Sequence, residues 1–325
     1  MMLPRRQLLR LAGLATAAAA VPRYATAQAY PSRPVRWVVP FPAGGSTDIV
    51  TRLLCEWLTQ RLGQQFIVEN KPGGGTNIGV EAVAHAPPDG YTLLLALTTN
   101  VINPSLYKSL PFDFQRDIAL VSGVAELPLV MDINPAVPAK TVAEFIAYAK
   151  ANPGKINFAS FGARTISHLA IELFKTSAGI DVVHVPYPGG GPMLTDMLSG
   201  RVQAGIDALP NSLPHIKDGG VRALAVLSAQ RTPALPDVST MGETIAGFEV
   251  KPWTALAVPS GTPDDIVTRL NREINAGLAD PGVKARLAQV GGTPLIYSTA
   301  EIRALAAHDL EKWAKVVKIA GIAPE

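Results

Sequence analysis

Short runs of β-branched and apolar residues alternate with helical stretches along most of the chain. Val35–Val39 has the composition of a strand. From Ser46 to Leu62, apolar residues recur at the i, i+3, i+4 and i+7 spacing of a helix, which Gly63 ends. The same order of strand and helix repeats toward the C-terminus. This alternation predicts the α/β class, with mainly parallel sheets flanked by helices.

The length of the chain indicates two lobes. A chain of 325 residues is longer than a single hydrophobic core usually supports. A strand near Glu126–Asp132 would leave the first lobe, and a strand near Trp253–Val258 would return to it, so that two crossings join the lobes. The expected division is residues 30–128 with 254–325 for lobe 1, and residues 129–253 for lobe 2.

Residues 1–27 have the pattern of an export signal. Arg5 and Arg6 precede an apolar run from Leu11 to Val21, and small residues follow around Ala27 and Ala29. The paired arginines resemble a twin-arginine signal, and cleavage is expected near Ala27 or Ala29. The alternative is a buried amphipathic helix. A leader of this kind predicts a periplasmic protein.

Most of the basic excess lies in that leader. The whole chain has 29 Lys and Arg against 26 Asp and Glu, and the leader holds four arginines and no acid, which leaves 25 basic against 26 acidic residues. A nearly neutral protein is poorly suited to bind nucleic acid or an anionic membrane surface. No later stretch reaches the ~18 consecutive apolar residues of a membrane span.

Three glycine-rich segments each follow a predicted strand and precede a predicted helix. They are residues 42–48, 160–165 and 187–192. Such loops lie at the carboxyl ends of strands, where open α/β sheets bind ligands, and they present backbone N–H groups at the positive end of a helix. Three together favour a small anion held between two lobes. The alternative for each segment is an ordinary tight turn.

The sequence lacks the common catalytic and cofactor signatures. It has no P-loop, dinucleotide fingerprint, nucleophile elbow or H-E-x-x-H, and its five histidines lack the spacing of a metal site. Cys55 is the single cysteine, which excludes an internal disulfide. We therefore expect no cofactor and no metal. A hydrolase that uses Ser46 or Ser160 with His168 as the base is a remote alternative.

Two charged residues are candidates for ligand contact. Arg164 stands in a glycine-rich loop at a helix start, where the helix dipole does not favour a cation. A bidentate grip on a carboxylate would explain it, and a solvated side chain is the alternative. Asp207 ends a predicted strand and would accept hydrogen bonds either from a ligand or from loop amides.

Ordered motifs run through almost the whole chain. They include Tyr30-Pro31-Ser32-Arg33-Pro34, Val39-Pro40-Phe41-Pro42-Ala43-Gly44-Gly45-Ser46-Thr47-Asp48, Val68-Glu69-Asn70-Lys71-Pro72-Gly73-Gly74-Gly75, Pro88-Asp89-Gly90-Tyr91, His184-Val185-Pro186-Tyr187 and Pro259-Ser260-Gly261-Thr262-Pro263. Together they resemble the Bug-type receptors of tripartite tricarboxylate transporters, a group of bacterial periplasmic solute-binding proteins.

The resemblance implies a type II periplasmic-binding-protein fold, in which two α/β lobes close on a small carboxylate. Di- and tricarboxylates, acidic amino acids and aromatic acids are the implied ligands. Two positions depart from the family pattern, because Arg164 stands where glycine is usual and Pro188 where Lys or Arg is frequent. The predicted ligand-binding residues, with Arg164 added, are Phe41, Ala43, Gly44, Ser46, Arg164, Thr165, Ser167, Pro186, Tyr187, Gly189 and Asp207.

The sequence therefore predicts a non-enzymatic receptor that captures a small carboxylate in the periplasm. It would deliver this solute to the permease subunits of an inner-membrane transporter. The alternative is a ligand-sensing adaptor that presents its closed form to a sensor kinase. No nucleic-acid partner is expected.

Overall fold

The computed structural model describes residues 30–319, 321, 322 and 324. The chain divides into a short N-terminal unit, Met1–Ser32, and a larger unit, Arg33–Glu325, which contains every helix and strand described below. The predicted leader, with the cleavage positions near Ala27 and Ala29, lies outside the described residues.

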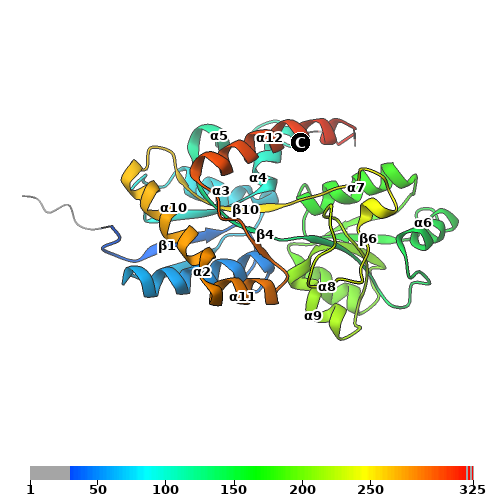
Figure 1. Ribbon diagram of the computed structural model, residues 1–325. Helices are drawn as coiled ribbons and strands as arrows, with labels where there is room; N and C mark the ends of the chain where they lie inside the picture. The colour runs from blue at the N-terminus through cyan, green and yellow to red at the C-terminus, as the bar shows by residue number, and fades with distance from the viewer. Residues whose placement is uncertain (1–29, 320, 323, 325) are drawn as a thin grey trace, which may run out of the picture. The chain divides into compact units, whose positions relative to one another are not determined.

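Sheet A has the strand order β11-β4-β10-β3-β1-β2 (Figure 1). Strand β1 runs parallel to β2 and β3, whereas β10 runs antiparallel to β3 and β4, and β11 antiparallel to β4. The strands are β1 (Val35–Val39), β2 (Phe66–Asn70), β3 (Thr92–Leu97), β4 (Ile118–Glu126), β10 (Trp253–Pro259) and β11 (Thr293–Pro294).

Sheet B has the order β7-β6-β8-β5-β9. Here β6 runs parallel to β7 and β8, and β5 runs antiparallel to β8 and β9. The strands are β5 (Leu129–Ile133), β6 (Asn157–Ser160), β7 (Val183–Pro186), β8 (Ala204–Ala208) and β9 (Arg222–Val226). The α/β class with two sheets is confirmed, but both sheets are mixed rather than mainly parallel. The antiparallel pairing arises at β5 and β10, because the chain enters each of these strands from the other sheet and not through a crossover helix.

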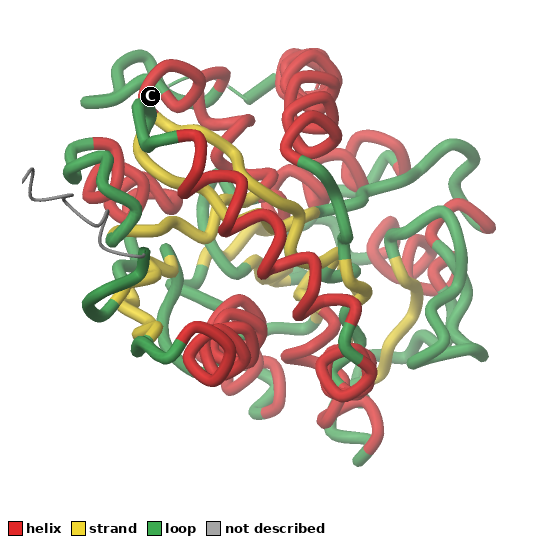
Figure 2. Tube along the Cα trace, turned by 60° about the vertical axis from the view of Figure 1, so that its left-hand side comes forward, coloured by secondary structure: helices red, strands yellow, loops and turns green. Residues whose placement is uncertain are grey.

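Helices surround the strands, as Figure 2 shows. Around sheet A lie α2 (Ser46–Leu62), α3 (Asn77–Ala84), α4 (Thr98–Ile102), α5 (Phe114–Asp117), α10 (Asp264–Ala279), α11 (Pro281–Gln289) and α12 (Thr299–Ile319). Around sheet B lie α6 (Val142–Ala151), α7 (Ile166–Ala178), α8 (Gly190–Leu198) and α9 (Leu209–Lys217). Among the described residues, none of these helices is both long and apolar enough to cross a membrane.

Several helix ends follow directly from local sequence. Gly63 adopts the left-handed conformation, with φ of 70°, and its N–H donates to the carbonyl of Thr59, which closes α2 as predicted. A capping box begins α12, because the Ser298 hydroxyl accepts from the N–H of Glu301 and the Glu301 carboxylate accepts from the N–H of Ser298. Thr141 caps α6 in the same way, by accepting from the N–H of Glu144.

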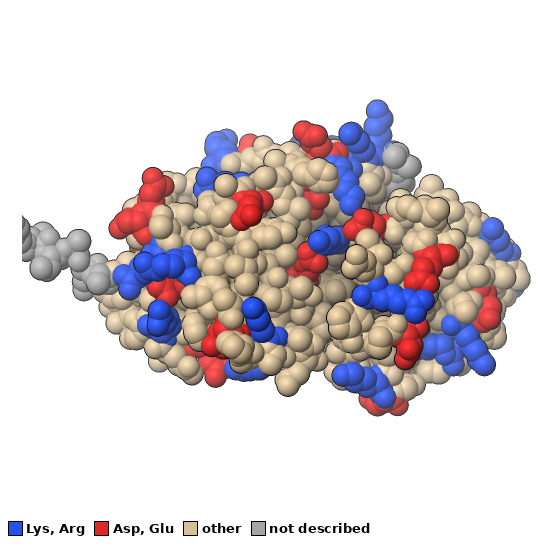
Figure 3. Space-filling view, viewed as in Figure 1, with Lys and Arg blue, Asp and Glu red and all other residues tan. Residues whose placement is uncertain are grey.

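Two segments carry the chain between the sheets. Only Leu127 and Pro128 separate β4 from β5, and the chain returns through Pro252 to β10. Helix α12 also joins the two parts, because its Trp313 and Val317 pack in one hydrophobic cluster with residues of sheet B and α7. Figure 1 shows α12, in red, extending toward α7. On the face seen in Figure 3, acidic and basic side chains are interspersed, as the near-neutral composition leads one to expect.

A pair of carboxyl groups is buried in sheet B. Asp132 on β5 and Asp207 on β8 are both fully buried, and Asp132 pairs in register with Gly205, two residues before Asp207. Within the described chain, neither carboxylate oxygen of Asp132 has a hydrogen-bond partner. Burial, reinforced by the negative charge of Asp207, raises the pKa of Asp132 to about 8. Asp132 is therefore mainly protonated at neutral pH.

We predict that Asp132→Asn stabilises the protein at alkaline pH. The folded pKa of about 8 lies above the unfolded value of 3.8, so the folded chain holds the extra proton. Stability contributed by this group is full below about pH 4 and decreases as the pH rises to about 8. Melting temperatures across pH 4–9 should show the variant exceeding the wild type most at high pH. A difference that does not vary with pH would contradict the assignment.

Candidate functional site

A cavity of about 170 Å³ lies where loops from both sheets meet. It is lined by residues 41–47, 97–99, 127, 129, 161, 166, 189–192, 208, 211 and 252–254. The loops that follow β1, β3 and β6 contribute, as does the loop before α8. Both crossing segments contribute as well, through Leu127 and Pro252. The cavity therefore lies at the carboxyl ends of several strands, where α/β proteins bind their ligands.

The start of α2 opens onto this cavity. Its N-cap is Gly45, so no side chain caps the helix, and the first-turn N–H groups are left for a ligand. Gly44 precedes it with a φ of 82°, a conformation that favours glycine. The nearby Asp48 carboxylate accepts from the N–H of Gly44 at 2.9 Å and is paired with Arg52 at 2.8 Å. Its charge is thereby compensated, and the helix start remains favourable for an anion.

The start of α8 meets the start of α2. Gly189 is its N-cap and likewise offers no capping side chain. A methyl group placed on Gly189 would lie 3.2 Å from the Pro42 ring, so the two glycine-rich loops are in close contact. One on Gly190 would collide with the side-chain amide of Asn211. Two uncapped helix starts thus face one another across a single small space.

The structure brings five of the predicted site residues together in the cavity lining: Phe41, Ala43, Gly44, Ser46 and Gly189. Ser46 is buried, and no described residue bonds its hydroxyl. The carbonyl of Phe41 accepts from the Asn70 side chain at 3.0 Å, which fixes the loop from behind.

The other six predicted residues lie outside the lining: Arg164, Thr165, Ser167, Pro186, Tyr187 and Asp207. Several of them tie neighbouring segments together. The hydroxyl of Thr165 donates to the carbonyl of Gly162 at 2.7 Å, and that of Ser167 donates to the carbonyl of Ile206. The hydroxyl of Tyr187 donates to Asp196, and burial together with this carboxylate raises the pKa of Tyr187 to about 12.

Asp207 supports a lining residue rather than lining the cavity itself. Its Oδ1 accepts from the N–H of Ala208 at 2.8 Å and from the side-chain amide of Asn211 at 3.1 Å. Burial raises the pKa of Asp207 to about 6. The carboxyl therefore fixes the orientation of the Asn211 amide, which does line the cavity.

Arg164 makes a contact across the two parts of the chain. It is one of two described non-glycine residues with positive φ, at 59°, in the conformation that favours glycine. Its guanidinium carbon lies 5.6 Å from the centre of the Tyr107 ring, within cation–π distance. Tyr107 follows the short helical turn at Asn103–Ser105, on the sheet A side.

The structure does not pair His168 with the serines suggested for a hydrolase. Ser160 is fully buried, and its hydroxyl bonds Nε2 of His184 at 2.7 Å. The ring of His168 stacks on that of His184 at 3.9 Å, and its Nδ1 accepts from the N–H of Arg164. Burial, together with His168, lowers the pKa of His184 to about 3, so the stacked pair is neutral at physiological pH. Among the described residues, no three His, Cys, Asp or Glu side chains form a potential metal site.

Sequence reasoning missed the apolar part of the lining. Phe161 lies inside the glycine-rich segment 160–165, and it packs edge-on against Phe41, with ring centres 5.8 Å apart. Leu97 ends β3 and Trp253 begins β10, so their positions at strand ends were an available signal. Asn211 and Ile166 come from helix starts and had no local signal of their own.

The fold and the cavity together define a class. Two α/β parts joined by crossing segments, with helix N-termini meeting at a cavity between them, form the architecture of a solute-binding protein. The chain belongs to the tripartite tricarboxylate transporter family receptors (TctC), whose family model matches residues 50–322. This is a family of periplasmic solute-binding receptors.

Individual relatives agree with this assignment. The chain is 38% identical to protein BugT of Bordetella pertussis, over 97% of this chain and 98% of that protein. It is 35% identical to R. palustris Rpa4515, whose structure contains adipate, with a TM-score of 0.89 over 91% of this chain and 100% of that one. It is 31% identical to MatC (Rpa3494) from Rhodopseudomonas palustris with bound malate, with a TM-score of 0.83 over 89% of this chain and 100% of that one. The resemblance and the fold expected from the sequence are confirmed.

We predict that His184→Gln makes the protein less sensitive to acid. The folded pKa of about 3 lies below the unfolded value of 6.5, so the unfolded chain binds the extra proton between these values. The wild type therefore loses stability as the pH falls from about 6.5 to 3. Urea unfolding at pH 7 and pH 4 should show a smaller loss in the variant. Ser160→Ala removes the hydrogen bond but keeps the histidine, and it should retain the wild-type pH slope.

Proposed function

We propose that this receptor captures a small carboxylate in the cavity between its two sheets and delivers it to a membrane transporter of the tripartite type. The observation that carries the proposal is the meeting of two uncapped helix starts, α2 and α8, at one cavity. Open N–H groups and the helix dipoles favour a carboxylate there without a cationic side chain. The adipate and malate found in two related structures support this ligand class.

We propose direct ligand contact for Phe41, Ala43, Gly44, Ser46 and Gly189, which line the cavity. The remaining predicted residues would act by holding these loops in place or by closing over the ligand: Arg164, Thr165, Ser167, Pro186, Tyr187 and Asp207. Residues 30–128 with 254–325 would move as lobe 1 and residues 129–253 as lobe 2. Closure would exclude water and so strengthen each hydrogen bond to the anion.

The proposed role is binding without catalysis, in the periplasm, after removal of the leader near Ala27 or Ala29. Permease subunits in the inner membrane are the proposed partners, since the family is that of transporter receptors. No observation favours the sensor-kinase alternative over this assignment.

Thermal-shift and calorimetric titrations test the proposal. Ligand-stripped, refolded protein should be stabilised by at least one acid among hexanoate, adipate, malate and benzoate. A ligand at ~100 times its Kd adds about 2.7 kcal/mol to the free energy of unfolding. If every acid in this panel leaves the melting temperature of a well-folded sample unchanged, the carboxylate assignment is wrong.

Ser46→Ala should weaken binding of the active acid about tenfold, equivalent to about 1.4 kcal/mol, because one hydroxyl donor at the start of α2 is lost. Calorimetry measures this change. Ser109→Ala, at an exposed position outside the cavity lining, is the matched control and should bind as the wild type does. Equal affinities for all three proteins would remove Ser46 from the site.

A further inference from the structure

The cavity is lined by uncharged side chains. No Asp, Glu, Lys, Arg or His is among its described lining residues. Any charge on a bound solute must therefore be compensated by hydrogen-bond donors and helix dipoles rather than by an ion pair. Where such donors lie decides how many charges the cavity can accept.

Most of the open donors are gathered at one end. The residues that begin α2 and α8 line the cavity, and the hydroxyls of Ser46 and Thr47 have no partner among the described residues. Gly189 touches Pro42, so the two helix starts form one place for an anion rather than two. These groups can surround a single carboxylate.

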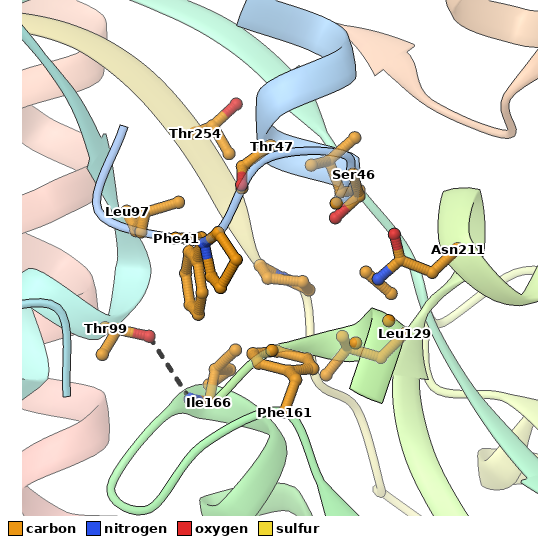
Figure 4. A pocket seen from close by; sticks show the side chains of 18 of the residues that line it. Phe41, Ser46, Thr47, Leu97, Thr99, Leu129, Phe161, Ile166, Asn211 and Thr254 are labelled. Carbon is orange, nitrogen blue, oxygen red and sulfur yellow. Dashed lines mark hydrogen bonds between the residues drawn. The ribbon is translucent and has the colours of Figure 1, made fainter. Parts of the chain in front are cut away.

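The threonines elsewhere in the lining already have backbone partners. The hydroxyl of Thr98 donates to the carbonyl of Trp253 and accepts from its N–H at 2.8 Å. That of Thr254 bonds both the carbonyl and the N–H of Ala125. The hydroxyl of Thr99 accepts from the N–H of Ile166 at 3.3 Å, the bond dashed in Figure 4. Thr98 and Thr254 therefore have no hydroxyl donor left for a ligand, and the single O–H of Thr99 is too little to compensate a second carboxylate.

Asn211 offers the cavity an acceptor. Its amide nitrogen must face Asp207, because Oδ1 of Asp207 also accepts the N–H of Ala208 and is therefore an acceptor. The amide oxygen is left, and Figure 4 shows it on the side toward Ser46. One N–H of the amide is left as well, so Asn211 by itself neither builds nor excludes a carboxylate site.

The rest of the lining is apolar. Figure 4 shows Phe161 and Ile166 on the far side of the cavity from Ser46 and Thr47, with Phe41 between them. Phe41 and Phe161 pack edge to face, with ring centres 5.8 Å apart and planes at 80°. This surface suits an aromatic, cyclic or branched hydrocarbon group. A charged group placed against it would lose its hydration and gain at most the Thr99 hydroxyl as a partner.

We propose that the solute is a monocarboxylate with an uncharged, apolar body, which the receptor selects over di- and tricarboxylates and over amino acids. The carboxylate binds at the starts of α2 and α8, and the body lies against Phe41 and Phe161. This inference rests on the proposed function. It separates the chain from the relatives crystallised with adipate and malate, which are dicarboxylates.

Two matched pairs of acids test the proposal by calorimetry on the wild-type protein. Hexanoate should bind at least 100-fold more tightly than adipate, and benzoate at least 100-fold more tightly than terephthalate. Each pair differs only in the second carboxylate. Adipate or terephthalate that binds as tightly as its partner overturns the inference but leaves the carboxylate receptor intact. Binding of none of the four overturns the inference, and if malate fails to bind as well, the carboxylate receptor is overturned too.

A charge placed on the apolar side provides a second test. Phe161→Arg should shift the adipate-to-hexanoate affinity ratio toward adipate by at least tenfold, because it supplies a partner for the second carboxylate. Phe161→Leu is the matched control, which removes the ring without adding charge and should keep the monocarboxylate preference. An unchanged ratio in Phe161→Arg, with its melting temperature intact, contradicts the proposed pose. If Phe161→Arg fails to fold, titration of the matched acids into the wild type and into Phe161→Leu still tests the proposal.

Discussion

The contact between two glycine-rich loops is the constraint on which the site depends. Gly189 packs so closely against Pro42 that a methyl group on it would lie 3.2 Å from the proline ring, and this packing brings the starts of α2 and α8 together. Each helix has glycine as its N-cap, so no capping side chain accepts a hydrogen bond from the first N–H groups of either helix. The proposed anion site therefore arises from an absence of side chains, and its charge preference comes from backbone dipoles.

A buried carboxyl pair supports the same site from behind. Asp207 is held by Ala208 and Ser212 as well as by Asn211, whereas Asp132 is buried beside it without a hydrogen-bond partner among the described residues. Keeping a proton on Asp132 limits the negative charge next to an anion-binding cavity.

Local signals made much of the framework predictable, and contacts between distant segments explain what was missed. Gly63 and the Ser298–Glu301 box fixed helix ends because their bonds lie within a few residues. The glycine-rich loops likewise predicted the end of the cavity where we propose that the carboxylate binds. Helix α9 was not expected, because Pro210 and Pro214 obscure its pattern, although Pro210 occupies the first turn, where proline is tolerated. The mixed sheets and the apolar lining depend on which strands and loops meet in space.

Arg164 stands where glycine is usual in the family, and its contacts give a structural reason for the arginine. Its positive φ is a conformation that costs a non-glycine residue roughly 1–2 kcal/mol, so something must offset that cost. The guanidinium lies over Tyr107, and two residues on, the N–H of Ile166 bonds Thr99. Both contacts join the start of α7 to the sheet A side at one edge of the cavity. Whatever Arg164 does for a ligand, it contributes to the attachment between the two parts, so opening of the cavity must either break these contacts or pivot about them.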